Sequence, residues 1–398
     1  MKILWFPRLQ FDISKLHITT WREMCIELEG MGCEVRIAIA GKDSNNIFGR
    51  DYVQIFLIKK KYLRILSFWI FGYIKFLYTY FVYKPDVVIL DIYSVWFSIP
   101  FAIISQIRSL FIVDNRTPFY NLKLNKFSIK DKIMKFYTKL SYWYSRLFLD
   151  GLTVITNYYK HQICKSLKFD SSLIGVWGSG VNTDQFSPQS HADDNRPSFL
   201  KGKFVLMQHG DMSYNRGLFE TIEAVRMIDK EDIILVLIGD GKAKNEILKQ
   251  IKKHGLERKI YILPPVRHFE IPAYISYCNC AIMAYPNIEY WNNNNPIKLL
   301  EYLAMGKVVI CTDMWTFRDV AGNKKCSYYI KNNNPETIAK AINYFYKNKK
   351  FLKEWGKEGV DIIKQEFTWH NQAKKLIDFI EQLQDVKIIK YKKVKGKK

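Results

Sequence analysis

Short apolar runs of strand type alternate with longer segments of helical pattern from one end of the chain to the other. This alternation predicts an α/β fold built from doubly wound domains with parallel sheets. The predicted strands cover residues 2–6, 34–40, 52–58, 86–90, 111–113, 152–155, 172–176, 203–208, 232–238, 260–263, 279–284 and 307–311. The predicted helices cover residues 15–30, 62–83, 94–108, 128–148, 157–167, 217–228, 242–254, 268–277, 296–305, 335–347, 350–364 and 369–384.

The chain has 398 residues, which is too long for one ordinary hydrophobic core. Prolines and polar residues gather at 187–200 and indicate a linker between two domains. We therefore predict a first domain at 1–186, a second domain at 201–366, a C-terminal helix at 367–386 and a disordered basic tail at 387–398.

The chain is strongly basic: 61 Lys and Arg face 38 Asp and Glu, which gives a net charge of +23. Such an excess implies an anionic partner, and the candidates are nucleic acid, a phospholipid surface or a phosphorylated substrate. An AT-rich genome also produces many Lys, Asn, Ile and Tyr codons, so the number of lysines alone does not choose among these partners.

The seven cysteines are scattered and show no paired CxxC spacing. This distribution predicts neither a disulfide framework nor a zinc site, and it fits a reducing compartment. The apolar run before Pro7 is too short for a signal peptide and is interpreted as a first strand. We therefore expect a cytoplasmic protein.

The segment 295–310 carries the most specific pattern in the chain. Its apolar residues predict a helix that Gly306 ends, followed by a short buried strand. Lys298 and Glu301 lie near the start of this helix, where backbone N–H groups and the helix dipole favour anions. Four asparagines and Pro296 lead into it, an opening suited to a ligand. From these residues alone, an ordinary capped helix with a solvated Lys–Glu pair is an equally good interpretation.

The run from Pro296 to Val309, Pro-x-Lys-x-x-Glu-Tyr-x-Ala-x-Gly-Lys-x-Val, resembles the motif of glycosyltransferase family 4, also called group 1. Further segments resemble the same family in the right order, at 177–188, 209–218, 237–241 and 367–369. Each segment is weak by itself, but five in order form a specific pattern. The first 170 residues match the family only in outline.

This resemblance implies a GT-B fold, in which two Rossmann-like domains face each other across a cleft and the C-terminal helix crosses back to the first domain. It implies a retaining glycosyltransferase of hexosyltransferase type that needs no metal ion and no other cofactor. The donor would be a UDP- or GDP-sugar. The acceptor would be a growing, lipid-linked glycan of a bacterial surface polysaccharide or lipopolysaccharide.

The resemblance also assigns the catalytic group to Arg216, Lys298 and Glu301. Arg216 stands where the family usually has the Lys that contacts the diphosphate, and it keeps the charge. Many relatives have another Arg directly after Gly210, but this chain has Asp211 there, so Lys298 is expected to compensate. Glu301 corresponds to the glutamate that accepts hydrogen bonds from the two ribose hydroxyls.

Other positions are expected to line the nucleotide-sugar. Gly210, Gly239 and Gly241 lie in loops where the absence of a side chain allows close approach. Asn293 stands where the family has the first glutamate of its Glu-x7-Glu pair, so the identity of the donor sugar cannot be carried over. The remaining two predicted contacts are Pro265, beside the base, and Pro296, which opens the motif.

The acceptor side is predicted in the first domain. Relatives often carry a histidine after a cleft-facing strand, but the corresponding stretch here has none. Asp114, Asn115 and Arg116 are expected to line the cleft in its place. Lys15 and His17, on the first loop, are further acceptor-side candidates, with a surface helix as the alternative for His17.

Two segments of the first domain, 62–83 and 123–146, mix lysines with many aromatic residues. This mixture predicts helices that lie on an anionic membrane surface. Ordinary helices with inward aromatics and solvated lysines are the alternative. The segment 62–83 is long enough to span a bilayer, but Lys75 near its centre argues against a span.

Two other functions fit part of the pattern. A nucleotide-sugar epimerase would share the GT-B domains but needs additional acidic residues in its site. A non-enzymatic nucleic-acid-binding protein would explain the charge, but it predicts one strongly basic module, whereas the basic residues here are spread over the chain. We therefore expect no nucleic-acid partner.

Overall fold

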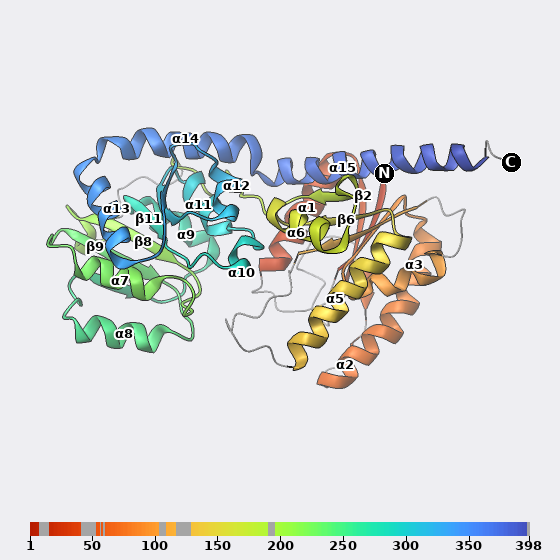
Figure 1. Cartoon of the computed structure of the whole chain (residues 1–398), viewed down its shortest axis with the longest axis horizontal. Coiled ribbons are helices and arrows are strands. Elements are labelled where there is room, and N and C mark those ends of the chain that lie inside the picture. Colours follow the sequence, from red (N-terminus) through yellow and green to blue (C-terminus); the bar gives the residue numbers. More distant parts are fainter. Residues whose placement is uncertain are drawn as a thin grey trace. The chain divides into compact units, whose positions relative to one another are not determined.

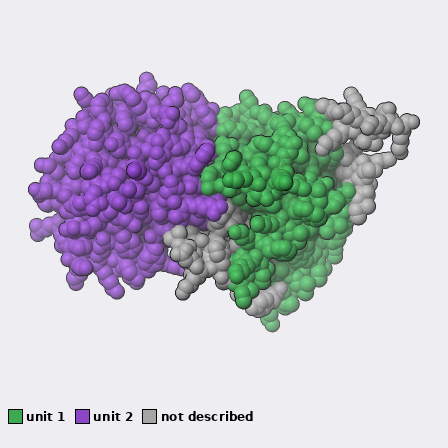
Figure 2. Space-filling model, in the orientation of Figure 1, with its two compact units in different colours: residues 1–178, 369–398 green, residues 179–368 purple. Residues whose placement is uncertain are grey.

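The computed structural model describes residues 1–7, 16–40, 53–55, 57–58, 60–102, 109–116, 129–189 and 196–395. It divides into two compact units: unit 1 comprises Met1–Gly178 with Trp369–Lys398, and unit 2 comprises Ser179–Thr368 (Figure 2). The division falls earlier than the predicted boundary at residue 186. The reason is that the backbone N–H of Val181 donates to the carbonyl of Phe367 at 2.9 Å, and Phe186 is buried in the core of unit 2.

Unit 1 contains a seven-stranded sheet in the order β3-β2-β1-β4-β5-β6-β7, and every pairing is parallel. Its strands are β1 (Lys2–Phe6), β2 (Glu34–Ala40), β3 (Val53–Ile55), β4 (Val87–Leu90), β5 (Leu110–Asn115), β6 (Gly151–Val154) and β7 (Ile174–Val176). The apolar runs predicted from the sequence form this sheet, because parallel strands are covered on both faces and need continuous apolar residues.

Helices cover the sheet of unit 1 (Figure 1). They are α1 (Leu16–Gly30), α2 (Lys61–Ser67), the π-helical η2 (Phe68–Gly72), α3 (Tyr73–Tyr83), the 3-10 helix η3 (Ser94–Ser98), α4 (Ile99–Ala102), α5 (Ile129–Phe148), α6 (Asn157–Leu167), the 3-10 helix η4 (Ser171–Leu173) and α15 (Trp369–Lys395). The predicted helix 94–108 is in fact η3 followed by the single turn α4, and its last six residues lie outside the described part.

The C-terminal helix α15 belongs to unit 1, as predicted. Its buried residues recur at helical spacing and join α1 in one core cluster with Trp5 and Trp177. These buried residues of α15 are Trp369, Ala373, Leu376, Phe379, Ile380 and Leu383. The prediction of a disordered tail from residue 387 is wrong for most of that segment, because α15 continues as a helix to Lys395.

Unit 2 contains a six-stranded parallel sheet in the order β10-β9-β8-β11-β12-β13. Its strands are β8 (Phe204–His209), β9 (Ile233–Ile238), β10 (Ile260–Leu263), β11 (Cys280–Met283), β12 (Val308–Thr312) and β13 (Ser327–Ile330). Its helices are η6 (Ser198–Leu200), α7 (Leu218–Arg226), α8 (Lys244–Lys253), η7 (His268–Glu270), α9 (Ile271–Ser276), α10 (Glu289–Asn292), α11 (Ile297–Ala304), α12 (Trp315–Ala321), α13 (Pro335–Lys347) and α14 (Lys350–Glu366).

The predicted α/β class with two doubly wound parallel sheets is confirmed. In unit 2 the strand order reverses direction between β8 and β11, because β9 and β10 lie on one side of β8 and β11 to β13 on the other. Open α/β sheets bind ligands at such a switch point, beyond the carboxyl ends of the strands. The loops after β8 and β11 are therefore where a site is expected in this unit.

Candidate active site

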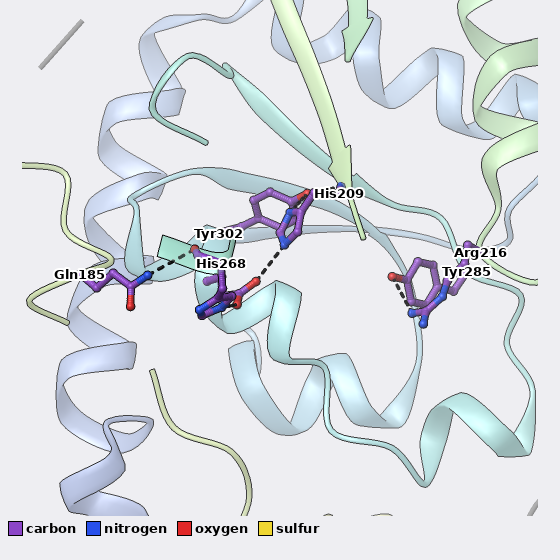
Figure 3. A network of polar contacts seen from close by, with 7 residues as sticks. Gln185, His209, Arg216, His268, Tyr285 and Tyr302 are labelled. Carbon is purple, nitrogen blue, oxygen red and sulfur yellow. Dashed lines mark hydrogen bonds and ion pairs between the residues drawn. The ribbon is translucent and has the colours of Figure 1, made fainter. Parts of the chain in front are cut away.

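The candidate site of unit 2 is built from three segments that meet at this switch point. They are the end of β8 with the loop that follows it, the residues after β11, and the first turns of α11. Hydrogen bonds join His209, the last residue of β8, to Glu301 and Tyr302 of α11 (Figure 3). Parallel strands that end at one edge of a sheet thus bring together residues about ninety positions apart.

Glu301 lies between two histidines. Its Oε2 is 2.9 Å from Nε2 of His209, and its Oε1 is 2.7 Å from Nε2 of His268. The carboxylate and His209 are buried, whereas the side chain of His268 is 53% exposed. A second hydrogen bond positions the backbone of His268, because Nε2 of Gln185 donates to its carbonyl at 3.3 Å (Figure 3).

The hydrogen bonds around His209 indicate its tautomer. The Tyr302 hydroxyl accepts from the backbone N–H of His209 at 3.0 Å, so its own proton is directed to Nδ1 of the ring, 2.7 Å away. Nδ1 is then an acceptor, and the ring proton is on Nε2, where it is donated to Glu301. Burial lowers the pKa of His209, against the opposing effect of Glu301, which agrees with a neutral ring.

The two other members of this network are shifted toward their charged forms. Burial alone would raise the pKa of the Glu301 carboxyl, but hydrogen bonds from His209 and His268 outweigh it and hold that pKa at about 2. The hydrogen bond to Glu301 raises the pKa of His268, against partial burial. Glu301 is therefore a buried, ionised acceptor whose Oε1 faces the exposed side of the network.

A second group of residues carries positive charge, and two of its members, Arg216 and Tyr285, stand apart from the histidines in Figure 3. A guanidinium N–H of Arg216 donates to the Tyr285 hydroxyl at 3.1 Å, and its Cζ lies 4.2 Å from the ring centroid of Trp291. Lys298 projects from α11 onto the backbone of Gly210, so that a side chain at residue 210 would overlap its Nζ. All of these residues belong to unit 2.

The cations in this group are incompletely paired. Within the described residues, Nζ of Lys298 and Nε of Arg216 are buried and have no hydrogen-bond partner. Burial lowers the pKa of Lys298. Burial alone would raise the pKa of the Tyr285 hydroxyl, but the charges of Lys298 and Arg216 outweigh it and lower that pKa. The lowered pKa of Tyr285 indicates a locally positive environment, in which Nε of Arg216 lies 4.0 Å from Oδ2 of Asp211. Such an environment favours an anion.

The asparagines before α11 contribute buried amide groups to the site. Asn293 is fully buried, and its side-chain N–H donates to the carbonyl of Glu289 at 2.8 Å. Within the described residues, Oδ1 of Asn293 and Oδ1 of Asn295 are buried without a hydrogen-bond donor. Buried acceptors of this kind suit the hydroxyl groups of a ligand.

The structure explains the glycines after β8 and β9 by a close contact between two loops, which the sequence did not reveal. We predicted that Gly239 and Gly241 allow a nucleotide to approach. In the structure, the neighbour that approaches them is the loop at 210–212: a Cβ on Gly239 would overlap the carbonyl of Gly210, and one on Gly241 would overlap the carbonyl of Met212. The glycines therefore let the two loops pack together, with Gly210 N–H donating to Ile238 at 2.7 Å.

The two prolines that we predicted to contact the nucleotide-sugar have different surroundings. Pro296 is the N-cap residue of α11, and its carbonyl accepts from the N–H of Leu299 at 2.8 Å. Pro265 is exposed in the loop after β10.

The predicted acceptor-side residues are mostly internal to unit 1. Asp114 accepts from the Thr153 hydroxyl at 2.8 Å, and Asn115 donates to the hydroxyls of Tyr142 and Tyr159. Both side chains are buried in unit 1, and their assignment to the acceptor side stays a prediction. Burial raises the pKa of Asp114 to about 6, against the effect of Arg116.

Arg116 likewise has partners within unit 1. Its guanidinium donates to the carbonyls of Trp177 and Gly178 at 2.6 and 3.0 Å and lies over the Trp177 ring. It thus fixes the end of the chain segment that leaves unit 1. Lys15 lies outside the described residues, and His17 lies in α1 with a side chain that is not described.

Three residues of the site, His209, Tyr285 and His268, were not predicted from the sequence. His209 stands in the His-Gly pair used for the resemblance, and Tyr285 follows a predicted strand, so the carboxyl-end rule could have found both. His268 does not directly follow a predicted strand, so this rule does not indicate it. Among the described residues, no group of three His, Cys, Asp or Glu side chains could hold a metal ion.

Comparison with known proteins identifies a family model and individual proteins that are similar to this chain. Residues 190–361 match the family model described as glycosyl transferases group 1. A curated relative, an uncharacterized glycosyltransferase of Methanocaldococcus jannaschii, is 23% identical over 63% of this chain and 64% of its own length. Another, the N-acetylgalactosamine-N,N'-diacetylbacillosaminyl-diphospho-undecaprenol 4-alpha-N-acetylgalactosaminyltransferase of Campylobacter jejuni, is 27% identical over 39% of this chain and 40% of its own. These matches thus span less than two thirds of either relative.

Solved structures match over nearly the whole chain. A glycosyltransferase from Rickettsia africae has a TM-score of 0.74 at 17% identity and covers 96% of this chain and 98% of its own. HepE from Anabaena, solved in complex with UDP, has a TM-score of 0.74 at 13% identity and covers 96% of this chain and 100% of its own. At these identities the structures show the fold, which is GT-B.

Proposed function

We propose that this chain, whose residues 190–361 match the model of the glycosyl transferases of group 1, transfers a sugar from a UDP- or GDP-sugar to an acceptor hydroxyl with retention of configuration. The observation that carries the proposal is a pair of incompletely satisfied cations near an ionised acceptor: Lys298 stands one turn before Glu301 on α11, and Lys298 and Arg216 together lower the pKa of the Tyr285 hydroxyl. A nucleoside diphosphate presents the complementary groups, an anionic diphosphate and a vicinal diol.

The proposed roles follow from this complementarity. Lys298 and Arg216 stabilise the charge that develops on the leaving diphosphate, in a pocket from which water is largely excluded. Glu301 accepts hydrogen bonds from the ribose hydroxyls. Its Oε1 can do so while bonded to His268, because each carboxylate oxygen has two lone pairs. In a front-face mechanism the leaving phosphate itself takes the proton of the acceptor.

The donor sugar would meet the asparagines before α11. The buried acceptor oxygens of Asn293 and Asn295 can each take a sugar hydroxyl proton. Asn293 stands where the family carries a glutamate, so the donor sugar of relatives with the glutamate cannot be carried over to this chain. HepE was solved with UDP-glucose, which supports a UDP-sugar as the first donor to test.

For the acceptor we propose a lipid-linked glycan of the bacterial cell surface, assembled at the inner face of the cell membrane. The support is the name of the Campylobacter relative, which describes a transferase acting on a diphospho-undecaprenol glycan. We also propose that no metal ion takes part, because cationic side chains supply the positive field. Activity that survives EDTA supports this point, and a strict need for Mn²⁺ or Mg²⁺ contradicts it.

The test is calorimetric titration of UDP and GDP into the protein and into Arg216→Ala, Lys298→Ala and Glu301→Ala variants. The matched control is Lys253→Ala, which removes an exposed cation at the end of α8. We expect micromolar binding of one nucleotide, loss in the three site variants and no change in the control. Unchanged affinity in all three site variants would refute the assignment of this site.

A nucleotide-sugar epimerase is the alternative enzyme on the same fold. It would release the nucleotide from its sugar without any glycan acceptor. A donor screen that measures nucleotide release with and without membrane extract separates the two: release that needs the extract indicates a transferase, and release without it indicates the epimerase.

A further inference from the structure

Helix α5 carries a continuous apolar stripe on its exposed side. Six residues recur alternately four and three positions apart, which places them along one side of the helix. They are Ile129, Ile133, Phe136, Leu140, Trp143 and Leu147, and their exposed fractions lie between 38% and 78%. A stripe of this spacing normally faces a protein core, but here another side of the helix, with Tyr142 and Tyr144, occupies the core.

The neighbouring helical segment α2–η2–α3 repeats the feature. Six of its apolar residues recur three or four positions apart, and their exposed fractions lie between 42% and 63%. They are Leu63, Leu66, Ile70, Ile74, Tyr78 and Phe81. The other side of this segment is buried against the sheet through Phe76, Thr79 and Tyr83.

The two stripes belong to one region of unit 1, because both helices pack against η3. Trp96 of η3 donates to the Tyr137 hydroxyl of α5 at 2.7 Å. Phe97 of η3 lies 5.4 Å from Phe68 and 5.8 Å from Phe76, ring centroid to ring centroid. In Figure 1 the two helices run nearly parallel. We call these twelve exposed side chains the two-stripe face.

Positive charge accompanies the two-stripe face. The segment 60–84 contains five basic residues, and no acidic residue occurs in the sequence between Asp51 and Asp86. Helix α5 contains five basic residues and one acidic residue, and Lys132, Lys139 and Arg146 are exposed. Apolar and aromatic side chains beside lysines are typical of helices that lie in a membrane interface.

We propose that the two-stripe face is a docking surface for an anionic lipid bilayer, in which α5 and α2–η2–α3 lie in the interface with their axes along the membrane. The charge decides against a second copy of this chain, because two such faces would bring like charges together. It favours anionic lipid, whose headgroups supply the opposite charge beside an apolar layer. The proposal does not depend on the nucleotide-sugar assignment.

The same residues argue against a membrane span. By length and composition, Leu63–Tyr83 could cross a bilayer. Its buried side is part of the core of unit 1, however: Phe76 packs on Phe6 at a centroid distance of 5.4 Å, and the Tyr83 hydroxyl donates to the carbonyl of Glu34 at 2.7 Å. Crossing the membrane would extract this side from the sheet, so the helix can only present its exposed side.

The experiment is sedimentation of the full-length protein with vesicles of phosphatidylcholine alone and of phosphatidylcholine with phosphatidylglycerol at a ratio of about 7:3. Three leucine variants of similar exposure are compared: Leu66→Asp on α2 and Leu147→Asp on α5 test the stripes, and Leu248→Asp on α8 is the control. These side chains are 55%, 48% and 46% exposed. Circular dichroism and a thermal melt verify that each variant is folded.

We expect binding to the anionic vesicles only, release by high salt, and a loss of about tenfold or more in each stripe variant, since each removes a leucine and adds a negative charge. The Leu248→Asp control should bind as the parent does. Four results would overturn the proposal: equal or no binding to both vesicle types, stripe variants that bind normally, protein that resists extraction at alkaline pH, and a dimer in light scattering that Leu147→Asp dissociates.

Discussion

Nε2 of His268 lies 2.7 Å from Oε1 of Glu301, and the two residues belong to segments that follow different strands of the unit 2 sheet. One partner is buried and the other half exposed, so the interaction connects the interior of the site with its surface. The other carboxylate oxygen is held by a neutral His209. The result is a fixed, ionised acceptor at the position where we propose that the ribose binds.

The His268–Glu301 pair should make stability depend on pH. The folded-state pKa of His268 is raised above 6.5, so its contribution is complete below pH 6.5 and is lost as pH rises through the raised value. The folded-state pKa of Glu301 is lowered from 4.5 to about 2, so its contribution is present above pH 4.5 and is lost toward pH 2. The pair therefore stabilises most between about pH 4.5 and 6.5.

This dependence is measured by urea unfolding of the parent and of His268→Gln. Because His268 is half exposed, we expect the variant to lose about 1 kcal/mol or less at pH 5.5 and nearly nothing at pH 9. His161→Gln, which changes an exposed histidine of α6, serves as the control and should show no such difference. An equal loss at both pH values would contradict the ionised pair.

Lys298 should lower the stability of the ligand-free protein. Its buried Nζ has no hydrogen-bond partner among the described residues, and burying a charged group without such a partner is costly. We expect Lys298→Met to raise the free energy of unfolding by about 1 kcal/mol while nucleotide affinity falls. Lys307→Met is the matched control, because Nζ of Lys307 donates to the carbonyl of Ser276 at 2.8 Å, so its removal should destabilise. Equal destabilisation by both changes would contradict the interpretation.

Arg216 should contribute to binding more than to folding. Removal of its charge-assisted bonds to a diphosphate is expected to weaken nucleotide binding by about 1.5–3 kcal/mol in Arg216→Ala. Arg216→Lys should recover part of this loss, because it restores the charge but not the planar fork. Isothermal titration calorimetry measures both. Affinity that does not depend on this side chain would remove Arg216 from the site.

The loops after β8 and β9 pack so closely that a side chain added at their contact should destabilise the fold. In Gly239→Ala, the new Cβ would overlap the carbonyl of Gly210 at a backbone φ of 139°, so we expect a loss of more than about 2 kcal/mol in unfolding free energy. Gly30→Ala is the control, because a Cβ there meets nothing within 4 Å and the backbone φ is ordinary. A neutral Gly239→Ala would show that the two loops are not tightly packed.

The sequence predicted most of the sheets, because continuous apolar runs have few other uses in a chain of this kind. It missed β13, an edge strand whose Tyr328 and Tyr329 interrupt the apolar run. It also missed α10 and α12, which are too short to show a helical period. The wrong domain boundary has a similar cause: the pairing of Val181 with the 367–368 segment joins residues far apart in sequence.

The site was predicted in part. The helix at 297–304 and its Lys–Glu pair follow from local spacing and from the resemblance, so Lys298 and Glu301 could be found. The contact of His268 with Glu301 spans 33 positions and depends on the sheet, so no local pattern indicates it. Asp114 and Asn115 were assigned from the resemblance, at the stretch where relatives often carry a histidine. Their hydrogen bonds to Thr153, Tyr142 and Tyr159 join separate elements of unit 1, so no local pattern indicates them.

The most direct test of the central claim is transfer of label from a panel of UDP- and GDP-sugars to bacterial membrane extract, with the parent protein and with Glu301→Gln. The variant keeps the size of the side chain but removes the ionised acceptor for the ribose hydroxyls. The proposed function predicts label in the lipid-linked glycan fraction with at least one donor, and its loss in the variant. No transfer from any donor, or equal transfer by both proteins, would contradict it.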